Sequence, residues 1–122
     1  MLAGIYNIVC EQGTTFTRVI TLEFPDADDP TVFLPWDFTG YTARMQIRRT
    51  IESSTIMIEL TTENGGITFT NPAQGEMTIE MTATQTADLS SSGVYDVEII
   101  SDDGEVSRLI QGSFTLNLEV TR

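Results

Sequence analysis

The 122-residue sequence contains no histidine and no lysine. Without histidine, a chain cannot assemble a Ser-His-Asp triad, an imidazole general base or a histidine metal ligand. Without lysine, it has neither Schiff-base chemistry nor the phosphate-binding lysine of a P-loop. Because the usual routes to catalysis are closed, we expect a protein that is not an enzyme and that holds no cofactor.

Cysteine is almost absent as well, since Cys10 is the only one. A single thiol cannot form a disulfide within the chain, and no set of cysteines is available to hold a metal. Cys10 lies in the apolar run Ile8-Val9-Cys10, which favours a small buried hydrophobic residue over a reactive thiol. The core is therefore expected to form by packing alone, which a chain of this length allows.

Long apolar runs are missing too. No run approaches the roughly 20 residues that span a bilayer, and the N-terminal residues 1–6 lack the basic and apolar regions of a secretory signal. Eighteen acidic residues against six arginines give a net charge of −12, which repels phosphate backbones and anionic membranes. We expect synthesis in a cytoplasm and neither nucleic acid nor a membrane as partner.

The sequence does contain many stretches of alternating apolar and polar residues. In residues 41–48, Tyr41, Ala43, Met45 and Ile47 share one face, as in a half-buried strand. The same alternation recurs in 56–61, 77–82, 95–99 and 114–120, and 5–10 and 15–24 add two early strands rich in β-branched residues. The only helical fragment is expected at 84–89.

Turn signals between these strands indicate how they connect. Residues 63–66 (Glu-Asn-Gly-Gly) and 101–104 (Ser-Asp-Asp-Gly) predict tight antiparallel connections. We predict a single all-β domain over residues 1–122, an antiparallel β-sandwich of Ig-like or jelly-roll-like type with one short helical turn; a small barrel is the alternative. The first strand (5–10) and the last (114–120) are expected at sheet edges or as exchanged arms.

Residues 25–38 are interrupted by three prolines, which oppose regular strand pairing and predict a long loop. Its large apolar residues are Phe33, Leu34 and Trp36. Such a loop can contact a partner, or it can fold over the open end of the domain. The capping interpretation suits Trp36 and the contact interpretation suits Phe33.

The only cationic cluster consists of Arg44, Arg48 and Arg49. These arginines can match the charge of Glu59 or Glu98 on neighbouring strands. Alternatively, they can dock an acidic partner, because guanidinium groups form bidentate pairs with carboxylates.

Two sets of carboxylates are further candidates. Asp26, Asp28 and Asp29 can supply oxygen ligands to calcium, although they lack the glycine and distal glutamate of an EF-hand loop and can equally be solvated. Glu76 and Glu80 share a strand face, as a catalytic pair requires, but the threonines that alternate with them are typical of a solvated surface.

Several segments resemble the small β-domain proteins encoded by tailed bacteriophages. They are Glu11-Gln12-Gly13-Thr14-Thr15-Phe16, the run Asp37 to Arg48, Leu60 to Ile67, Gly93 to Glu98, Gly104 to Gly112 and Val120-Thr121-Arg122. The resemblance implies a virion structural part, either a β-sandwich attached to the capsid exterior or an adaptor that anchors baseplate and fibre proteins. The chain departs from the adaptor pattern because no coiled-coil or receptor-binding extension follows Arg122.

This resemblance implies a capsid decoration or cement protein that binds the outer shell as a small oligomer, with a trimer among the options. Its partners would be other copies of itself and a phage capsid or tail protein, and its location would be the virion. A tail, baseplate or fibre-adaptor component is the alternative. A carbohydrate-binding module is a third possibility, with Trp36, Tyr41 and Tyr6 as stacking platforms for sugars.

Overall fold

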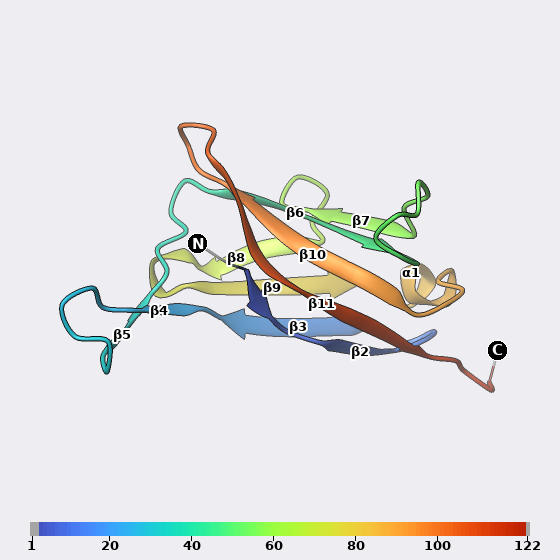
Figure 1. Ribbon diagram of the computed structural model, residues 1–122. Coiled ribbons are helices and arrows are strands. Elements are labelled where there is room, and N and C mark those ends of the chain that lie inside the picture. The colour runs from blue at the N-terminus through green and yellow to red at the C-terminus, as the bar shows by residue number, and fades with distance from the viewer. Residues whose placement is uncertain (1–2, 122) are drawn as a thin grey trace.

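Two β-sheets face each other in the computed structural model, which describes residues 3–121 (Figure 1). Sheet A contains β1 (Gly4–Ile5), β2 (Ile8–Glu11), β6 (Thr42–Arg48), β7 (Ile58–Thr61), β10 (Gly93–Ile100) and β11 (Val106–Asn117). Sheet B contains β3 (Phe16–Thr21), β8 (Ile67–Asn71) and β9 (Glu76–Met81). The remaining elements are β4 (Glu23–Pro25), β5 (Phe33–Pro35), the 3-10 turn η1 (Pro72–Gln74) and α1 (Ala83–Ala87). The predicted all-β sandwich is confirmed. Met1 and Leu2 of the N-terminal stretch, and Arg122 of the closing motif, lie outside the described residues.

The core lies between the sheets and follows the alternation of the sequence. On β6, Ala43, Met45 and Ile47 are buried while the residues between them face outward. Val97 and Ile99 continue the same buried layer on β10. Burial of these side chains stabilises the sandwich by the transfer of apolar surface out of water.

The strand order identifies the type of sandwich. In sheet A the order is β1-β11-β10-β6-β7 with β2 also on β11, and in sheet B it is β3-β9-β8. This is the Ig-like order. In the Ig fold, strands G, F and C form one sheet, which strand C′ extends; β11, β10, β6 and β7 occupy these four positions.

The N-terminal strands depart from the purely antiparallel prediction. β1 and β2 both pair with β11 in parallel, with Gly4 opposite Ile110 and Ile8 opposite Phe114. The last strand is therefore interior to sheet A, and the prediction that it forms an edge is wrong. The first strand does lie at an edge, as predicted.

The two predicted turns have different outcomes. Residues 101–104 connect β10 and β11 as an antiparallel hairpin, with the Ser101 amide donating to the Glu105 carbonyl at 2.9 Å. Residues 63–66 instead lead from β7 in sheet A to β8 in sheet B, so the predicted hairpin there is wrong. The Asn64 side chain holds this crossover by accepting from the amides of Thr61 and Gly66.

Helix α1 confirms the expected helical fragment and carries the chain from β9 to β10. Thr82 caps it, because its hydroxyl accepts from the Gln85 amide while the Gln85 side chain accepts from the Thr82 amide. The buried Thr86 hydroxyl donates to the Thr14 carbonyl at 2.8 Å and ties the helix to the start of β3. Within residues 3–121, no helix is long and apolar enough to cross a membrane.

The predicted loop at 25–38 contains a short hairpin instead. β4 and β5 pair antiparallel, with Glu23 opposite Pro35 and Pro25 opposite Phe33. The prolines are tolerated because they stand at the ends of a two-stranded ribbon, where an amide donor can be missing. The hairpin projects from one end of the sandwich (Figure 1). The predicted strand 15–24 is correspondingly divided at Leu22, between β3 and β4.

Candidate functional site: two interaction surfaces

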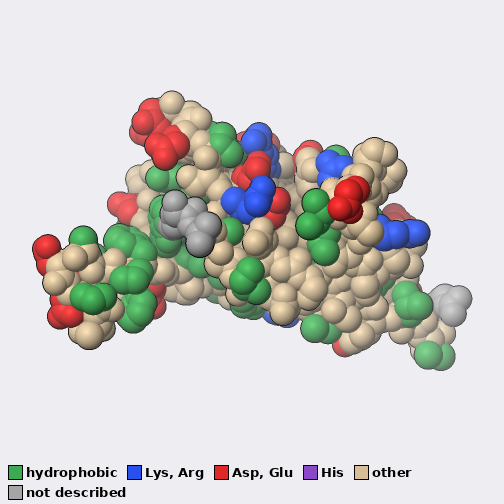
Figure 2. Space-filling view, in the orientation of Figure 1, with side chains coloured by type: hydrophobic (Ala, Val, Ile, Leu, Met, Phe, Trp, Pro, Cys, Tyr) green, Lys and Arg blue, Asp and Glu red, His purple; other side chains and the backbone are tan. Residues whose placement is uncertain are grey.

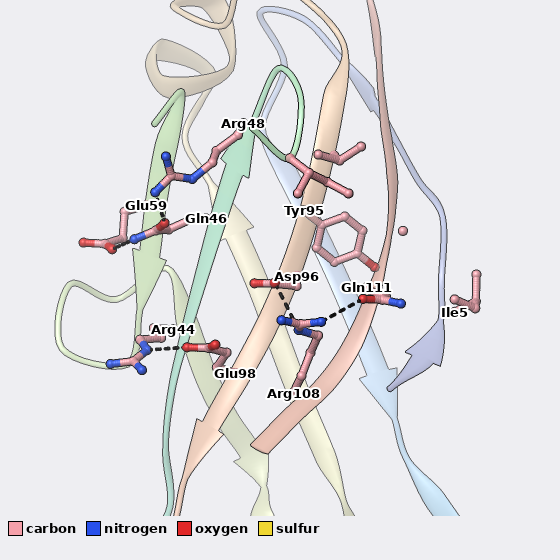
Figure 3. Close-up of a pocket in the computed structure, with 13 residues that line it drawn as sticks. Ile5, Arg44, Gln46, Arg48, Glu59, Tyr95, Asp96, Glu98, Arg108 and Gln111 are labelled. Atoms are coloured by element: carbon pink, nitrogen blue, oxygen red, sulfur yellow. Dashed lines mark hydrogen bonds and ion pairs between the residues drawn. The ribbon is translucent and has the colours of Figure 1, made fainter. Parts of the chain in front are cut away.

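The outer face of sheet A is hollowed into a groove of about 640 Å³ (Figure 3). We call it the sheet groove. Its polar lining is Arg44, Gln46, Arg48, Glu59, Asp96, Glu98, Arg108 and Gln111. Two exposed isoleucines, Ile5 and Ile51, also line it.

The alternation of β6 and β10 places charged residues in the groove. Where apolar residues face the core, their neighbours in sequence face the opposite side of the sheet. Arg44 of β6 stands opposite Glu98 of β10, and Gln46 stands opposite Asp96. On its other side, Gln46 stands opposite Glu59 of β7.

A β-bulge brings a third arginine into the groove. The register between β10 and β11 shifts after Val97, so that consecutive residues Leu109 and Ile110 are both buried. Arg108 consequently stands opposite Glu98 on the outer face. Neither Arg108 nor Asp96 is a candidate from the sequence alone. Arg108 depends on the bulge, which a period-two pattern does not reveal, whereas the alternation of residues 95–99 already places Asp96 on the same face as Glu98.

Ion pairs and hydrogen bonds connect the polar side chains of the groove (Figure 3). Arg44 Nε lies 2.7 Å from Glu98 Oε1, and Arg108 Nε lies 3.3 Å from Asp96 Oδ2. A second chain of contacts runs from Arg48 Nη2 to Gln46 Oε1 (2.8 Å) and from Gln46 Nε2 to Glu59 Oε2 (2.6 Å). The predicted charge match between the arginine cluster and a neighbouring glutamate is therefore present at Arg44 and Glu98.

The groove has no net charge, although the molecule as a whole is acidic. Its three arginines and its three carboxylates cancel, whereas the chain has a net charge of −12. Half of the six arginines of the chain line this one face. Partial burial raises the pKa of Asp96, and the Arg108 guanidinium opposes that rise.

Arg49 does not join the other two arginines of the predicted cluster. It lines a second, smaller hollow with Ser53, Met57 and Asp88. The reason is that consecutive residues at a strand end point to different sides. Arg48 instead donates to the Ser53 carbonyl at 2.7 Å as well as to Gln46.

The β4–β5 hairpin (Glu23–Pro35) is the second surface. It gathers four exposed large apolar side chains: Phe24, Val32, Phe33 and Leu34. Acidic side chains share the projection, so that Figure 2 shows hydrophobic and acidic groups together at this end of the molecule. Isolated exposed apolar residues are ordinary, but a cluster on a projecting element is typical of a contact surface.

Trp36 anchors the hairpin to the body. Its ring stacks on the buried Phe38 with centroids 5.7 Å apart and meets Phe24 edge-on at 5.9 Å. Phe38 packs in turn against Phe69 at 4.9 Å. Trp36 is thus half-buried, as the capping interpretation expects, while Phe33 is 57% exposed on the hairpin.

The acidic loop within the hairpin is organised by its own hydrogen bonds. Asp26 Oδ1 accepts from the Asp28 amide at 2.9 Å, and Asp29 Oδ1 accepts from the amide and hydroxyl of Thr31. The hydrogen bonds from Thr31 lower the pKa of Asp29. In the part of the chain that the structure describes, no group of three acidic residues is placed to hold a metal ion.

The remaining candidates have other contacts. Glu76 accepts from the Thr70 hydroxyl at 2.7 Å and Glu80 is exposed, and neither lines the sheet groove. Tyr41 packs edge-on against Phe38, whereas the Tyr6 hydroxyl accepts from Arg18 at 3.0 Å.

Cys10 is 1% exposed, which confirms the buried-hydrophobe interpretation. Burial also raises the pKa of its thiol. Because the thiolate is the reactive form, both effects oppose reaction at this sulfur.

No family model matches this chain, and no curated protein matches it. Among solved structures, the chain is similar to Drosophila OTK, extracellular domains 3-5, with 9% sequence identity and a TM-score of 0.35. The match covers 90% of this chain and 32% of that one, so the chain spans about a third of the length of the structure it matches.

Proposed function

We propose that this chain is a non-catalytic structural protein of a tailed-phage virion, which assembles on the particle through surface contacts. The observation that carries the proposal is the β4–β5 hairpin, where Phe24, Val32, Phe33 and Leu34 are exposed together on a projecting element. A sandwich with a buried core keeps such an element in a fixed position, which suits assembly on a regular lattice.

The sheet groove supports binding rather than catalysis. Each of its carboxylates has a partner within the groove: Glu98 and Asp96 pair with Arg44 and Arg108, and Glu59 accepts from Gln46. General acid–base catalysis needs a group poised to exchange a proton with a substrate. Ion pairs on an open sheet face are better suited to orienting a partner.

Within the virion, we propose the outer capsid shell as the location, as a decoration or cement protein. The resemblance to phage β-domain proteins supports this choice, and the same resemblance makes a tail, baseplate or fibre-adaptor role the alternative. Both roles require repeated copies and a protein lattice, and neither requires chemistry.

Electron microscopy of particles with and without the protein tests the proposal. We expect particles that lack it to lose density on the head surface, and purified protein added back to restore that density. Loss of density at the tail would support the alternative. Particles whose head and tail are both unchanged would refute the virion role.

Add-back with surface variants tests whether exposed apolar residues carry the contact. Phe33→Ser removes a side chain that is 57% exposed on the hairpin, and Val106→Ser removes one that is 50% exposed on β11 as a matched control. We expect the Phe33 variant to assemble less than the Val106 variant at equal concentration. Equal assembly of the two would show that the hairpin is not used.

A further inference from the structure

The two interaction surfaces have opposite shapes. The β4–β5 hairpin projects beyond the body of the sandwich (Figure 1), whereas the sheet groove is a hollow of about 640 Å³ on the outer face of sheet A (Figure 3). They belong to different parts of the molecule. We propose that the hairpin of one copy of this chain binds in the sheet groove of a second copy.

Charge makes the groove the favourable place for a hairpin to dock. The hairpin contains Glu23, Asp26, Asp28 and Asp29 and no cationic residue. A molecule with a net charge of −12 repels such an element over most of its surface. The groove instead holds three of the six arginines, and its own charges balance.

The groove arginines have donors left for a second partner. The Arg44 and Arg108 side chains are 49% and 53% exposed while they contact Glu98 and Asp96 through Nε. A guanidinium group carries five N–H donors in a planar fork. Each arginine can therefore keep its present carboxylate and bind a carboxylate of an incoming hairpin, with bidentate geometry available.

Apolar residues on the two surfaces also match. Ile5 and Ile51 line the groove and are 71% and 82% exposed. Phe33 and Val32 of the hairpin are exposed as well. Docking would remove these side chains from water together, which gives the contact a hydrophobic contribution beside its ion pairs.

The contact would be heterologous, because it joins different surfaces of the two copies. Each copy then offers one hairpin and one groove, so that successive contacts close into a ring or continue as an open chain, depending on the rotation between copies. The inference deepens the proposed function, on which it rests for the expectation that copies assemble.

Two double variants test the contact in solution. The groove variant, Arg44→Glu with Arg108→Glu, reverses the cations of the groove. The hairpin variant, Asp28→Arg with Phe33→Ser, removes one acidic and one apolar contact. Each should raise the dissociation constant for self-association at least about tenfold in analytical ultracentrifugation at low salt.

Mixing the two variants is the decisive step. The groove variant keeps an intact hairpin and the hairpin variant keeps an intact groove, so an equimolar mixture should form a 1:1 complex that neither variant forms alone. Failure of the mixture to associate would overturn the proposal, as would a native chain that stays monomeric at millimolar concentration. If the contact instead joined the same surface on both copies, mixing would not restore it, because one of the two partners would always carry the altered surface.

A matched control separates this contact from general charge effects. Asp102→Arg with Val106→Ser makes similar chemical changes to those of the hairpin variant, but on the exposed β10–β11 hairpin. It should associate like the native chain, and weakened association would count against the proposal. Circular dichroism and thermal melts would verify that all three variants fold.

The outcomes for this contact are independent of the outcomes on particles. If the chain is present in the virion but the mixture fails to associate, the contact is wrong and the proposed function stands. If the mixture associates but particles lack the chain, the contact stands and the virion role is wrong.

Discussion

The base of the β4–β5 hairpin depends on Gly75, and replacing it with alanine should destabilise the fold more than an ordinary turn glycine would. Gly75 has φ +73°, and a Cβ there would lie 2.4 Å from the Leu22 carbonyl oxygen and 3.0 Å from the Trp36 amide nitrogen. Both are backbone atoms, so neither can turn away as a flexible side chain would. The hairpin base would have to shift.

The size of the effect follows from the contacts that this shift disturbs. The left-handed conformation alone costs an L-residue about 1 kcal/mol. Two backbone hydrogen bonds, from Leu22 to the Gly75 carbonyl (2.9 Å) and from Trp36 to the Leu22 carbonyl (3.0 Å), hold the hairpin base. Weakening both adds about 1 kcal/mol each, for about 3 kcal/mol in total. For 122 residues this corresponds to a fall in melting temperature of about 12 °C.

Gly65 provides the control, because it has φ +82° and no atom lies within 4 Å of the position that a Cβ would occupy. Gly65→Ala should therefore cost only the conformational term, about 1 kcal/mol. Urea denaturation and thermal melts of both variants measure the difference. If the two variants lose the same free energy of unfolding, the close approach at Gly75 does not hold the hairpin, and the reasoning is refuted.

Three further predictions concern the core and the groove. Phe38→Ala should reduce the free energy of unfolding by about 3–5 kcal/mol in urea titration, because removing a ring that is 1% exposed leaves a cavity. A loss below about 1 kcal/mol would contradict the burial of this ring in the core. A double-mutant cycle with alanine at Arg44 and Glu98 should give a coupling free energy of at most about 1 kcal/mol that falls in salt, since the pair is exposed; strong, salt-insensitive coupling would be inconsistent with this. Because burial raises the pKa of Asp96, the native state takes up a proton first as pH falls. As pH falls through the raised native pKa of Asp96, the stability of the native chain relative to Asp96→Asn should therefore rise, and it should level off below the unfolded pKa of about 3.9. A relative fall as the pH approaches that value would show that Arg108 outweighs burial.

Part of the groove is predictable from the alternation of β6 and β10. Alternation placed Arg44 and Arg48 on the face opposite Ala43 and Met45, and Glu98 was a candidate partner by the same reasoning. The third arginine, Arg108, could not be anticipated, because its outward position depends on a bulge in the pairing of β10 with β11.

The β4–β5 hairpin is an element whose residues the sequence identifies but whose structure it does not. Its apolar and acidic residues were recognisable, but three prolines indicated a loop, and only pairing between Glu23–Pro25 and Phe33–Pro35 makes it a projecting ribbon. Proline opposes a central strand, whereas the end of a two-stranded ribbon accepts it. Local composition does not reveal which of these environments a proline will meet.

The sequence by itself determined where most of the strands lie and which face of each is buried, because side-chain alternation is a property of each strand alone. It also determined that histidine and lysine chemistry are excluded. It did not indicate β5 or β8 as strands, or β4 as separate from β3. Only the tertiary structure decided that β1 and β2 lie parallel to β11, that residues 63–66 cross between sheets, and that a bulge adds Arg108 to the groove. These features depend on which strands meet and in what register, and such pairing between distant segments is set by the packing of the whole domain.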